Sequence, residues 1–268
     1  MRSLVFLFLF LFSPCFSLKI DRVIVSTDTN PMYMDFWPIV AEAWEKLVGI
    51  RPTLAFIAPA DVEIDESLGD VIRFEPIEGV STVLQAQVVR HFLPLYFKDE
   101  GCLISDIDMI PLSKSFFIDT VADIPDDCFV VYRSAVALQY KEYVMCYNAA
   151  KGSTFGEVFG IDDIADIPEM IKRLAEQFNH KWQTDQLALY YYLRSWEHFE
   201  DRCALLQHPV EKRVDRINWK YDIEKLKSGY YIDSHMLRPY KRYKMHNDRL
   251  CGYLGFGPLA KNKKVEAQ

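Results

Sequence analysis

The sequence has no excess of positive charge. Its 31 lysines and arginines are outnumbered by 38 aspartates and glutamates, which gives a formal net charge of −7 over 268 residues. A protein whose main partner is nucleic acid is normally basic, because its lysines and arginines neutralise phosphates. We therefore expect no nucleic-acid partner. An acidic protein can still bind an anionic cofactor where a metal ion or a local basic cluster supplies positive charge.

The six cysteines include no C-x-x-C pair, and they are scattered along the chain. This spacing excludes the common zinc and thiol-redox motifs, which need paired cysteines. The chain also lacks internal repeats, low-complexity segments and long linkers rich in Pro, Gly or Ser. Half of its residues are hydrophobic, which is enough for a sizeable core. Residues 18–268 are therefore expected to form one domain.

Outside the N-terminus, no apolar run approaches the roughly 20 residues that a membrane-spanning helix needs. Arg2 precedes the apolar run 4–12, and the segment S-P-C-F-S follows at 13–17 and ends in a small residue. This is the pattern of an export signal, so residues 1–17 are predicted to be a signal peptide. An uncleaved membrane anchor is the alternative, because Phe16 and Leu18 lengthen the apolar stretch. Either interpretation predicts a protein of the secretory lumen or cell envelope, with membrane association through an uncleaved N-terminus. Without such a signal, the protein would be cytoplasmic.

Strand and helix patterns alternate along the first half of the chain. Buried-type strands are predicted at 22–26, 53–57, 71–74 and 101–105, and helices at 36–48 and 81–95. The alternation indicates an α/β fold, with a mostly parallel central sheet flanked by helices. The second half is less regular, with strands predicted at 128–137 and 143–148 and helices at 168–179 and 185–193. Ligands of such sheets bind at the carboxyl ends of the strands. The polar run 27–30 and the pair Asp106 and Asp108 are predicted to lie there.

Asp106 and Asp108 directly follow a buried strand, with the apolar Ile107 between them. In an extended chain, residues i and i+2 face the same side, and a turn would also bring the two carboxylates together. Two close carboxylates repel each other unless a cation lies between them. Hard divalent ions such as Mg²⁺ and Mn²⁺ prefer oxygen ligands and share them with phosphates. The pattern predicts such a site, and the alternative is a solvated strand end with two ordinary surface acids.

The segment 87–111, Q-V-V-R-H-F-L-P-L-Y-F-K-D-E-G-C-L-I-S-D-I-D-M-I-P, resembles the core of GT-A-type glycosyltransferases. These enzymes have a Rossmann-related fold, and the segment looks most like the glycogenin and lipopolysaccharide sugar transferase group, as a divergent member. The resemblance implies that Asp106 and Asp108 bind the metal, with Asp106 also at the nucleotide sugar. It also implies that Arg90 reaches toward the donor and that Thr27 and Asp28 line the base and ribose pocket.

Two later segments add to this resemblance. W-Q-T-D-Q at 182–186 resembles the D-Q element that faces the donor sugar and acceptor, which implies a role for Asp185. H-M-L-R-P-Y at 235–240 looks like a degenerate H-x-x-G-x-x-K-P-W without the glycine, which implies His235 as third metal ligand.

The basic residues in and after the second segment are Arg238, Lys241, Arg242 and Lys244, and we expect Arg238 and Lys241 to meet a diphosphate leaving group. Each of these residues has a structural alternative: Asp185 as a helix cap, His235 and Arg90 as satisfied structural residues, and the basic cluster as a solvated face.

Together these patterns predict a metal-dependent glycosyltransferase that moves a sugar from a nucleotide-diphosphate donor to a saccharide, lipid or protein acceptor. UDP-sugars and Mn²⁺ or Mg²⁺ are expected through the resemblance. One alternative is a non-catalytic, metal-dependent nucleotide-sugar binding protein. Another is a D-x-D phosphatase of the haloacid-dehalogenase type, but that motif normally ends the first strand, and here at least three predicted strands precede it.

Overall fold

The computed structural model describes residues 16–260. The predicted signal peptide or anchor at 1–17 therefore lies almost entirely outside the described residues. Within 16–260, no helix combines the length and the apolar character that crossing a membrane requires.

The main feature of the described chain is a seven-stranded sheet in the order β3-β2-β1-β4-β7-β6-β8. Neighbouring strands are parallel except where they meet β7, which runs antiparallel to β4 and β6. This confirms the predicted mostly parallel α/β sheet. The strands are β1 (Arg22–Asp28), β2 (Pro52–Ile57), β3 (Asp70–Phe74), β4 (Gly101–Ile104), β6 (Phe129–Val131), β7 (Asn148–Lys151) and β8 (Cys203–Leu205).

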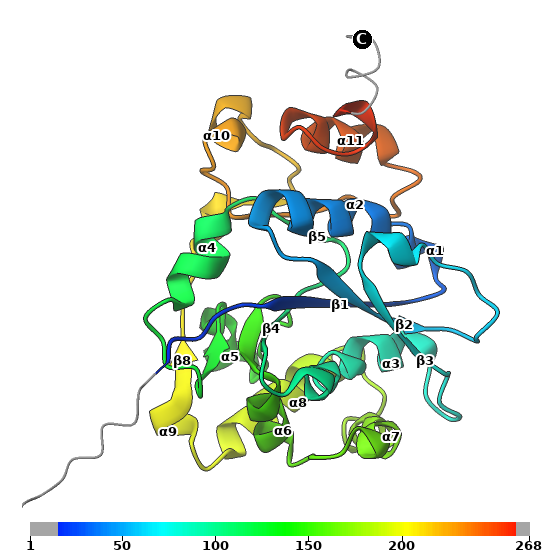
Figure 1. Ribbon diagram of the computed structural model, residues 1–268, viewed down its shortest axis with the longest axis vertical. Coiled ribbons are helices and arrows are strands. Elements are labelled where there is room, and N and C mark those ends of the chain that lie inside the picture. Colours follow the sequence, from blue (N-terminus) through cyan, green and yellow to red (C-terminus); the bar gives the residue numbers. More distant parts are fainter. Residues whose placement is uncertain (1–15, 261–268) are drawn as a thin grey trace, which may run out of the picture.

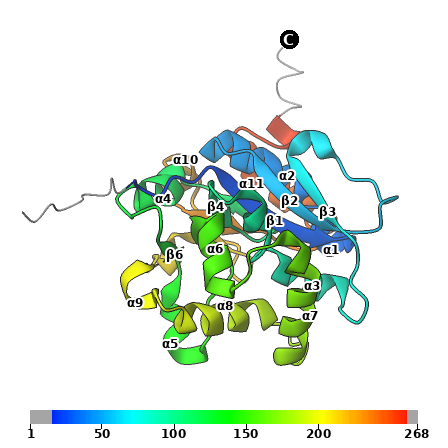
Figure 2. The ribbon, with the colours of Figure 1, turned by 60° about the horizontal axis from the view of Figure 1, so that its bottom comes forward.

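Helices cover both faces of this sheet (Figure 1). On one face lie α2 and α4, and on the other α3, α6, α7 and α8, which Figure 2 shows together from below. The helices of the described chain are α1 (Pro31–Met34), α2 (Trp37–Ala43), α3 (Thr82–Val89), α4 (Lys114–Ile118), α5 (Ala137–Tyr140), α6 (Gly152–Phe159), α7 (Ile167–Gln177), α8 (Thr184–Ser195), α9 (Phe199–Arg202), α10 (Ile223–Lys227) and α11 (Lys244–Tyr253).

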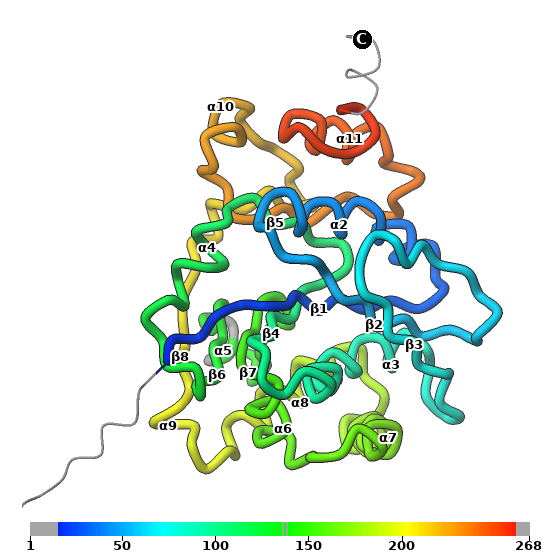
Figure 3. Tube along the Cα trace, viewed as in Figure 1, coloured from blue at the N-terminus to red at the C-terminus, as the bar shows by residue number. Residues whose placement is uncertain are grey.

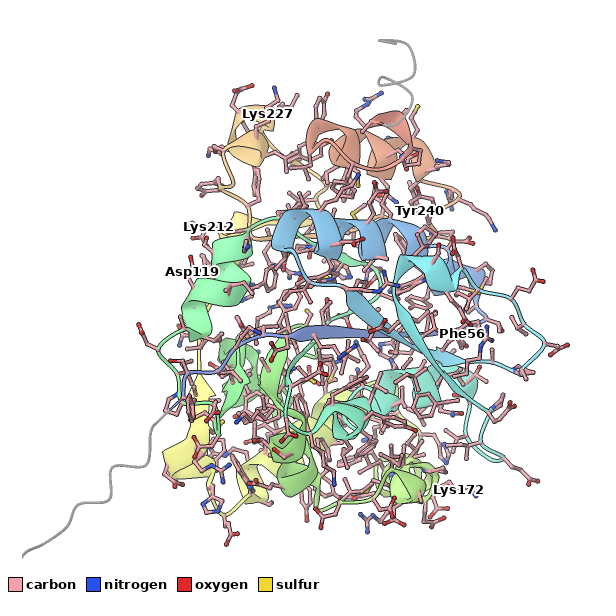
Figure 4. All side chains as sticks on the ribbon, in the orientation of Figure 1. Phe56, Asp119, Lys172, Lys212, Lys227 and Tyr240 are labelled. Atoms are coloured by element: carbon pink, nitrogen blue, oxygen red, sulfur yellow. The ribbon has the colours of Figure 1, made fainter. Side chains whose placement is uncertain are left out.

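Side chains alternate between the two faces along each central strand, as the period of a strand requires. On β1, Val23 and Val25 join the core beneath α2, whereas Ile24 joins the core that includes α3, α7 and α8. On β2, Phe56 belongs to the first of these cores. Figure 4 shows the side chains that fill the space between the layers, with Lys172 and Lys227 at the outer surfaces of α7 and α10. The two-sided burial fixes the register of the central strands.

A second, three-stranded sheet in the order β5-β10-β9 extends the core beneath α2. Its strands are β5 (Met109–Pro111), β9 (Arg213–Asp215) and β10 (Asp233–His235). Because β5 follows the D-x-D segment directly, this sheet brings the 213–238 region of the chain to the end of β4. Helix α10 connects β9 to β10 and α11 follows β10, and both helices lie beyond α2 (Figure 3).

Three boundary predictions are wrong. The strand predicted at 128–137 is only Phe129–Val131, because the chain turns into a 3₁₀ turn at Ser134–Val136 and then α5. The strand predicted at 143–148 instead begins at Asn148 and continues to Lys151. The helix predicted at 81–95 ends at Val89, and the 3₁₀ turn Leu93–Phe97 carries Pro94 at its start, where the missing amide proton is tolerated.

Gly101 is the position where the sheet leaves no room for a side chain. A Cβ atom there would lie 1.8 Å from the backbone oxygen of Lys19. The glycine thus allows the segment before β1 to cross the start of β4.

Candidate donor-binding site

A cavity of about 280 Å³ lies at the carboxyl ends of the parallel strands. The end of β1 contributes Thr27 and Asp28, and the turn after β4 contributes Asp106 and Asp108. Arg133 follows β6, which runs parallel to β4 through the shared neighbour β7. This is the edge at which open α/β sheets bind ligands.

Most of the predicted site residues line this one cavity. They come from five separate parts of the chain and are Thr27, Asp28, Arg90, Asp106, Asp108, Asp185, His235 and Arg238.

Lys241 is not among the lining residues, so the structure does not support its predicted role at the diphosphate. Its side chain is 76% exposed and forms an ion pair with Asp35 at 3.1 Å. Lys244 pairs with Asp248 one helical turn later. Apart from Arg238, the basic cluster of the tail is therefore the solvated face that was the structural alternative.

The D-x-D segment turns rather than continuing as a strand. The backbone N–H of Met109 donates to the carbonyl of Asp106 at 3.2 Å, which closes a tight turn. Ile107 is buried in the core, Asp108 is 4% exposed, and Asp106 is partly exposed to the cavity. The two carboxylates consequently meet different sets of cations.

Arg90 joins two carboxylates that are distant in sequence. It follows α3 and is 5% exposed. One terminal nitrogen donates to Asp106, and the other lies 3.0 Å from Asp185 Oδ2. The first nitrogen also donates to the carbonyl of Ser105 at 3.2 Å. These charge-assisted hydrogen bonds fix the D-x-D turn relative to α8.

Asp185 lies in the first turn of α8 and is 2% exposed. Burial raises the pKa of this carboxyl to about 7; Arg90 opposes the shift, and the charge of Asp106 adds to it. Asp185 is therefore a carboxyl whose protonation changes near neutral pH. Such perturbed groups occur often at functional sites, although structural ion pairs produce them too.

His91, the residue after Arg90, contacts this network through the backbone of Asp185. Its Nε2 lies 3.0 Å from the carbonyl of Asp185, and its ring packs against Phe159 at 4.6 Å between centroids. Burial, assisted by the charge of Arg90, lowers the pKa of His91 to about 3. The imidazole is thus neutral and structural.

Asp108 is surrounded by positive and hydrogen-bonding groups. Its Oδ2 lies 2.5 Å from a terminal nitrogen of Arg216, 3.4 Å from one of Arg238 and 3.5 Å from Nε2 of His235. Burial opposes ionisation, but His235 and the two arginines outweigh it and hold the pKa of Asp108 well below its usual range. Arg238 also donates to the hydroxyl of Tyr33 at 2.6 Å.

His235 lies between two carboxylates, because its Nδ1 is 3.6 Å from Asp215 Oδ2. Asp106, Asp108 and His235 all line the cavity, yet in the part of the chain that the structure describes, no three His, Cys, Asp or Glu side chains converge as a metal cluster. The oxygens expected to hold a metal instead contact guanidinium groups.

Sequence analysis missed three arginines of the cavity: Arg133, Arg213 and Arg216. Arg213 and Arg216 belong to β9 and the turn after it, and the small sheet brings them to the D-x-D turn. Arg213 pairs with Asp233 of β10 at 2.7 Å. The local signal was two arginines within the four-residue segment R-V-D-R around the buried Val214, and it does not reveal which carboxylates they meet.

The lining residues carry more positive than negative charge. Among the described residues, five arginines and His235 line the cavity together with four aspartates: Asp28, Asp106, Asp108 and Asp185. Arg216 and Arg238 share a single carboxylate. The cavity is therefore electrostatically suited to an anion, although the protein as a whole is acidic.

The comparisons with known proteins identify the fold. No protein-family model matches the sequence, and no curated protein matches it. The structure is similar to that of the galactosyltransferase LgtC in complex with donor and acceptor sugar analogs: the TM-score is 0.52 at 14% identity, covering 88% of this chain and 97% of that one. It is also similar to the glycosyltransferase GlyE of Streptococcus pneumoniae TIGR4, with a TM-score of 0.50 at 12% identity, covering 93% of this chain and 64% of that one. The chain thus has a divergent form of the GT-A glycosyltransferase fold, as the resemblance predicted.

Proposed function

We propose that this protein is a glycosyltransferase that moves a sugar from a nucleotide-diphosphate donor, with UDP-sugars favoured, to a saccharide, lipid or protein acceptor. The observation that carries the proposal is the cavity at the strand ends, where the D-x-D turn meets a surplus of arginines. A diphosphate is the anion that such a cavity suits, because guanidinium groups bind phosphate oxygens with two parallel hydrogen bonds. The GT-A fold supports the same assignment.

Arg216 and Arg238 are the residues we assign to the leaving diphosphate. Both contact the same oxygen of Asp108, so neither has a carboxylate of its own there. Charge grows on the departing phosphate as the glycosidic bond breaks, and preplaced cations stabilise that charge. In this proposal, the two guanidinium groups turn from Asp108 to the phosphate oxygens when the donor enters.

Thr27 and Asp28 are assigned to the nucleoside. They end β1 beside the cavity, next to Tyr33. The carboxylate of Asp28 accepts from Thr82 at 2.8 Å and from the backbone of Asn30 at 3.0 Å. These bonds hold the end of β1 in one conformation, so that the base and ribose would meet a preformed surface.

Asp106, Asp108 and His235 are the residues that would hold Mn²⁺ or Mg²⁺. Two carboxylates and an imidazole suit a divalent ion, and His235 Nε2 lies 3.5 Å from Asp108 Oδ2. When bound, the ion would supply Lewis acidity to the leaving group.

Asp185 and Arg90 are assigned to the reacting end of the donor. Asp185 lines the cavity next to Gln186, and Arg90 holds it at a fixed distance from Asp106. A carboxylate in this position would meet the sugar whose anomeric carbon becomes positively charged. Arg90 orients both aspartates, and we treat it as the positioning residue of the pair.

The arrangement disfavours a D-x-D phosphatase. The pair follows β4, the fourth strand in chain order, and not the first. Asp106, the would-be nucleophile, accepts a hydrogen bond from Arg90, which reduces its nucleophilicity.

Turnover distinguishes the three candidate functions. We expect the protein to release nucleotide from one UDP-sugar, slowly with water and faster with a sugar acceptor, and not to hydrolyse p-nitrophenyl phosphate. Binding without release would favour the non-catalytic binder, and hydrolysis of the phosphate ester would favour the phosphatase. Asp185→Asn is the variant to compare with the wild-type protein in these assays, because it keeps the side-chain volume of Asp185 while removing its charge.

We also propose that residues 1–17 direct export or anchor the protein to a membrane. Expression of the full chain and of a chain lacking 1–17, followed by fractionation, tests this. Equal amounts of both proteins in the soluble cytosolic fraction would argue against it.

A further inference from the structure

One cation of the cavity has no counter-ion. Arg133 lies two residues beyond β6 and lines the cavity at the same edge as Asp106. A terminal nitrogen donates to the sulfur of Cys146 at 2.9 Å, and Nε is buried without a partner. No carboxylate between residues 16 and 260 forms an ion pair with it, whereas each of the other four lining arginines has one.

The groups around Arg133 do not supply negative charge either. Burial raises the pKa of the Cys146 thiol to about 11, so the sulfur stays protonated and neutral. Burial, with the charges of Arg133 and Arg213, lowers the pKa of His208 to about 3, so this imidazole is neutral as well. Two carboxylates, Asp106 and Asp233, act on the same thiol, and they are paired with Arg90 and Arg213.

This group is distinct from the proposed diphosphate site. Arg216 and Arg238 contact Asp108, and Arg238 also contacts Tyr33, which lies after the end of β1. Arg133 instead contacts Cys146, which precedes β7. Arg216 and Arg238 follow β9 and β10 of the three-stranded sheet, whereas Arg133 follows β6 of the seven-stranded sheet, which lies on the side of β4 away from β1.

A partly buried guanidinium without a counter-ion is unfavourable, since it has lost part of its hydration and gained no anion. Its planar fork of donors matches a carboxylate or a phosphate. We propose that Arg133, next to Arg213, binds a second anionic group, a carboxylate or phosphate carried by the transferred sugar or by the acceptor. The substrate of this enzyme is then an acidic sugar. This inference rests on the proposed glycosyltransferase function.

The donor arm of the test compares two ligands that differ at one carbon. Calorimetry in the presence of Mn²⁺ measures the affinities of the protein for UDP-glucose and UDP-glucuronate. The affinities for UDP-galactose and UDP-galacturonate are measured in the same way. If the anion belongs to the donor, the wild-type protein prefers the acidic member of a pair at least tenfold, which is the size of one charge-assisted hydrogen bond. Arg133→Gln keeps a donor for Cys146 but removes the charge, and it abolishes the preference. Arg216→Gln weakens the binding of both members of a pair and leaves the ratio of their affinities unchanged.

The acceptor arm uses methyl glucoside, methyl glucuronide and glucose 6-phosphate as ligands of the protein saturated with UDP and Mn²⁺. If the anion belongs to the acceptor, one acidic compound binds at least tenfold more tightly than methyl glucoside, and Arg133→Gln removes the difference. The inference is overturned if neither arm shows a preference, or if Arg133→Gln keeps it.

A nucleotide-free measurement separates this inference from the proposed function. The melting temperature is compared in sulfate and in chloride at equal ionic strength, for wild type and Arg133→Gln. A sulfate-specific increase that is smaller in the variant supports an anion site at Arg133, even if no nucleotide binds. The inference is overturned if sulfate raises the melting temperature equally in the two proteins, or does not raise it in the wild type.

Discussion

Replacing Arg90 by Met should strongly destabilise the protein, because Arg90 is the buried partner of two carboxylates. Arg90 is 5% exposed and Asp185 is 2% exposed, so removing the guanidinium leaves a buried charge without compensation at any pH where Asp185 is ionised. Such a break costs about 3–5 kcal/mol. In a protein of this size, 1 kcal/mol corresponds to roughly 2–4 °C, so the melting temperature should fall by roughly 6–20 °C.

The cost should depend on pH through Asp185. Burial already raises its folded pKa to about 7, and Arg90 opposes that shift, so the variant raises it further. An acid whose folded pKa lies above its unfolded value binds its proton more tightly in the folded state. The stability of Arg90→Met therefore falls as the pH rises from the unfolded pKa of about 4 through the raised folded pKa. The variant should lose less stability at pH 5 than at pH 8.

Urea unfolding at pH 5 and pH 8 measures both effects. Arg51→Met is the control, because Arg51 pairs with Asp70 at 3.3 Å with about half of each side chain exposed, and such pairs contribute about 0–1 kcal/mol. Adding Asp185→Asn to Arg90→Met should restore part of the loss, with a coupling of about 1–3 kcal/mol. The reasoning would be refuted if Arg90→Met lost no more unfolding free energy than the control Arg51→Met. It would also be refuted if the double variant were no more stable than Arg90→Met alone.

Three further changes test other parts of the account. Because cations hold the pKa of Asp108 well below its usual range, its charge stabilises the fold above the unfolded pKa; Asp108→Asn should lower the urea midpoint at pH 7 and have a smaller effect at pH 3. Gly101→Ala should cost more than about 3 kcal/mol by thermal unfolding, since its Cβ meets backbone 1.8 Å away. The control Gly160→Ala, with φ +63° and open space, should cost about 1–2 kcal/mol. Lys241→Ala should change the UDP affinity by less than about twofold, because Lys241 pairs with Asp35, whereas Arg216→Gln should weaken it about tenfold or more in calorimetry.

The sequence was informative where a local pattern determines the structure. The strands β1, β2 and β4 contain continuous apolar runs, and burial on both faces of a parallel sheet produces that pattern. Ser81, the first residue of the helix predicted at 81–95, caps α3 through its side chain. The D-x-D pair was located correctly because it directly follows such a strand.

The errors occurred where tertiary contacts override the local pattern. The apolar residues at 143–147 suggested a strand, but Tyr143 and Tyr147 are buried in irregular chain that packs on the cores. Of the three cations predicted at the donor, Arg90 and Arg238 line the cavity, whereas Lys241 forms an ion pair with Asp35 and is not among the lining residues. Arg213 and Arg216 reach the site because β10, the partner of β9, pairs with β5, more than 100 positions earlier in the chain. Arg133 reaches it because β7 pairs with both β6 and β4. A single sequence does not encode these pairings locally.

The most direct test of the central claim is nucleotide binding in this cavity. The melting temperature is measured with UDP, GDP and their common sugar conjugates, with and without Mn²⁺, for wild type, Asp108→Asn and the surface control Arg51→Met. A ligand at a hundred times its dissociation constant adds about 2.7 kcal/mol of stability. The account predicts an increase with one nucleotide, larger with Mn²⁺, lost in Asp108→Asn and kept in Arg51→Met. No increase with any nucleotide in folded wild-type protein would contradict it.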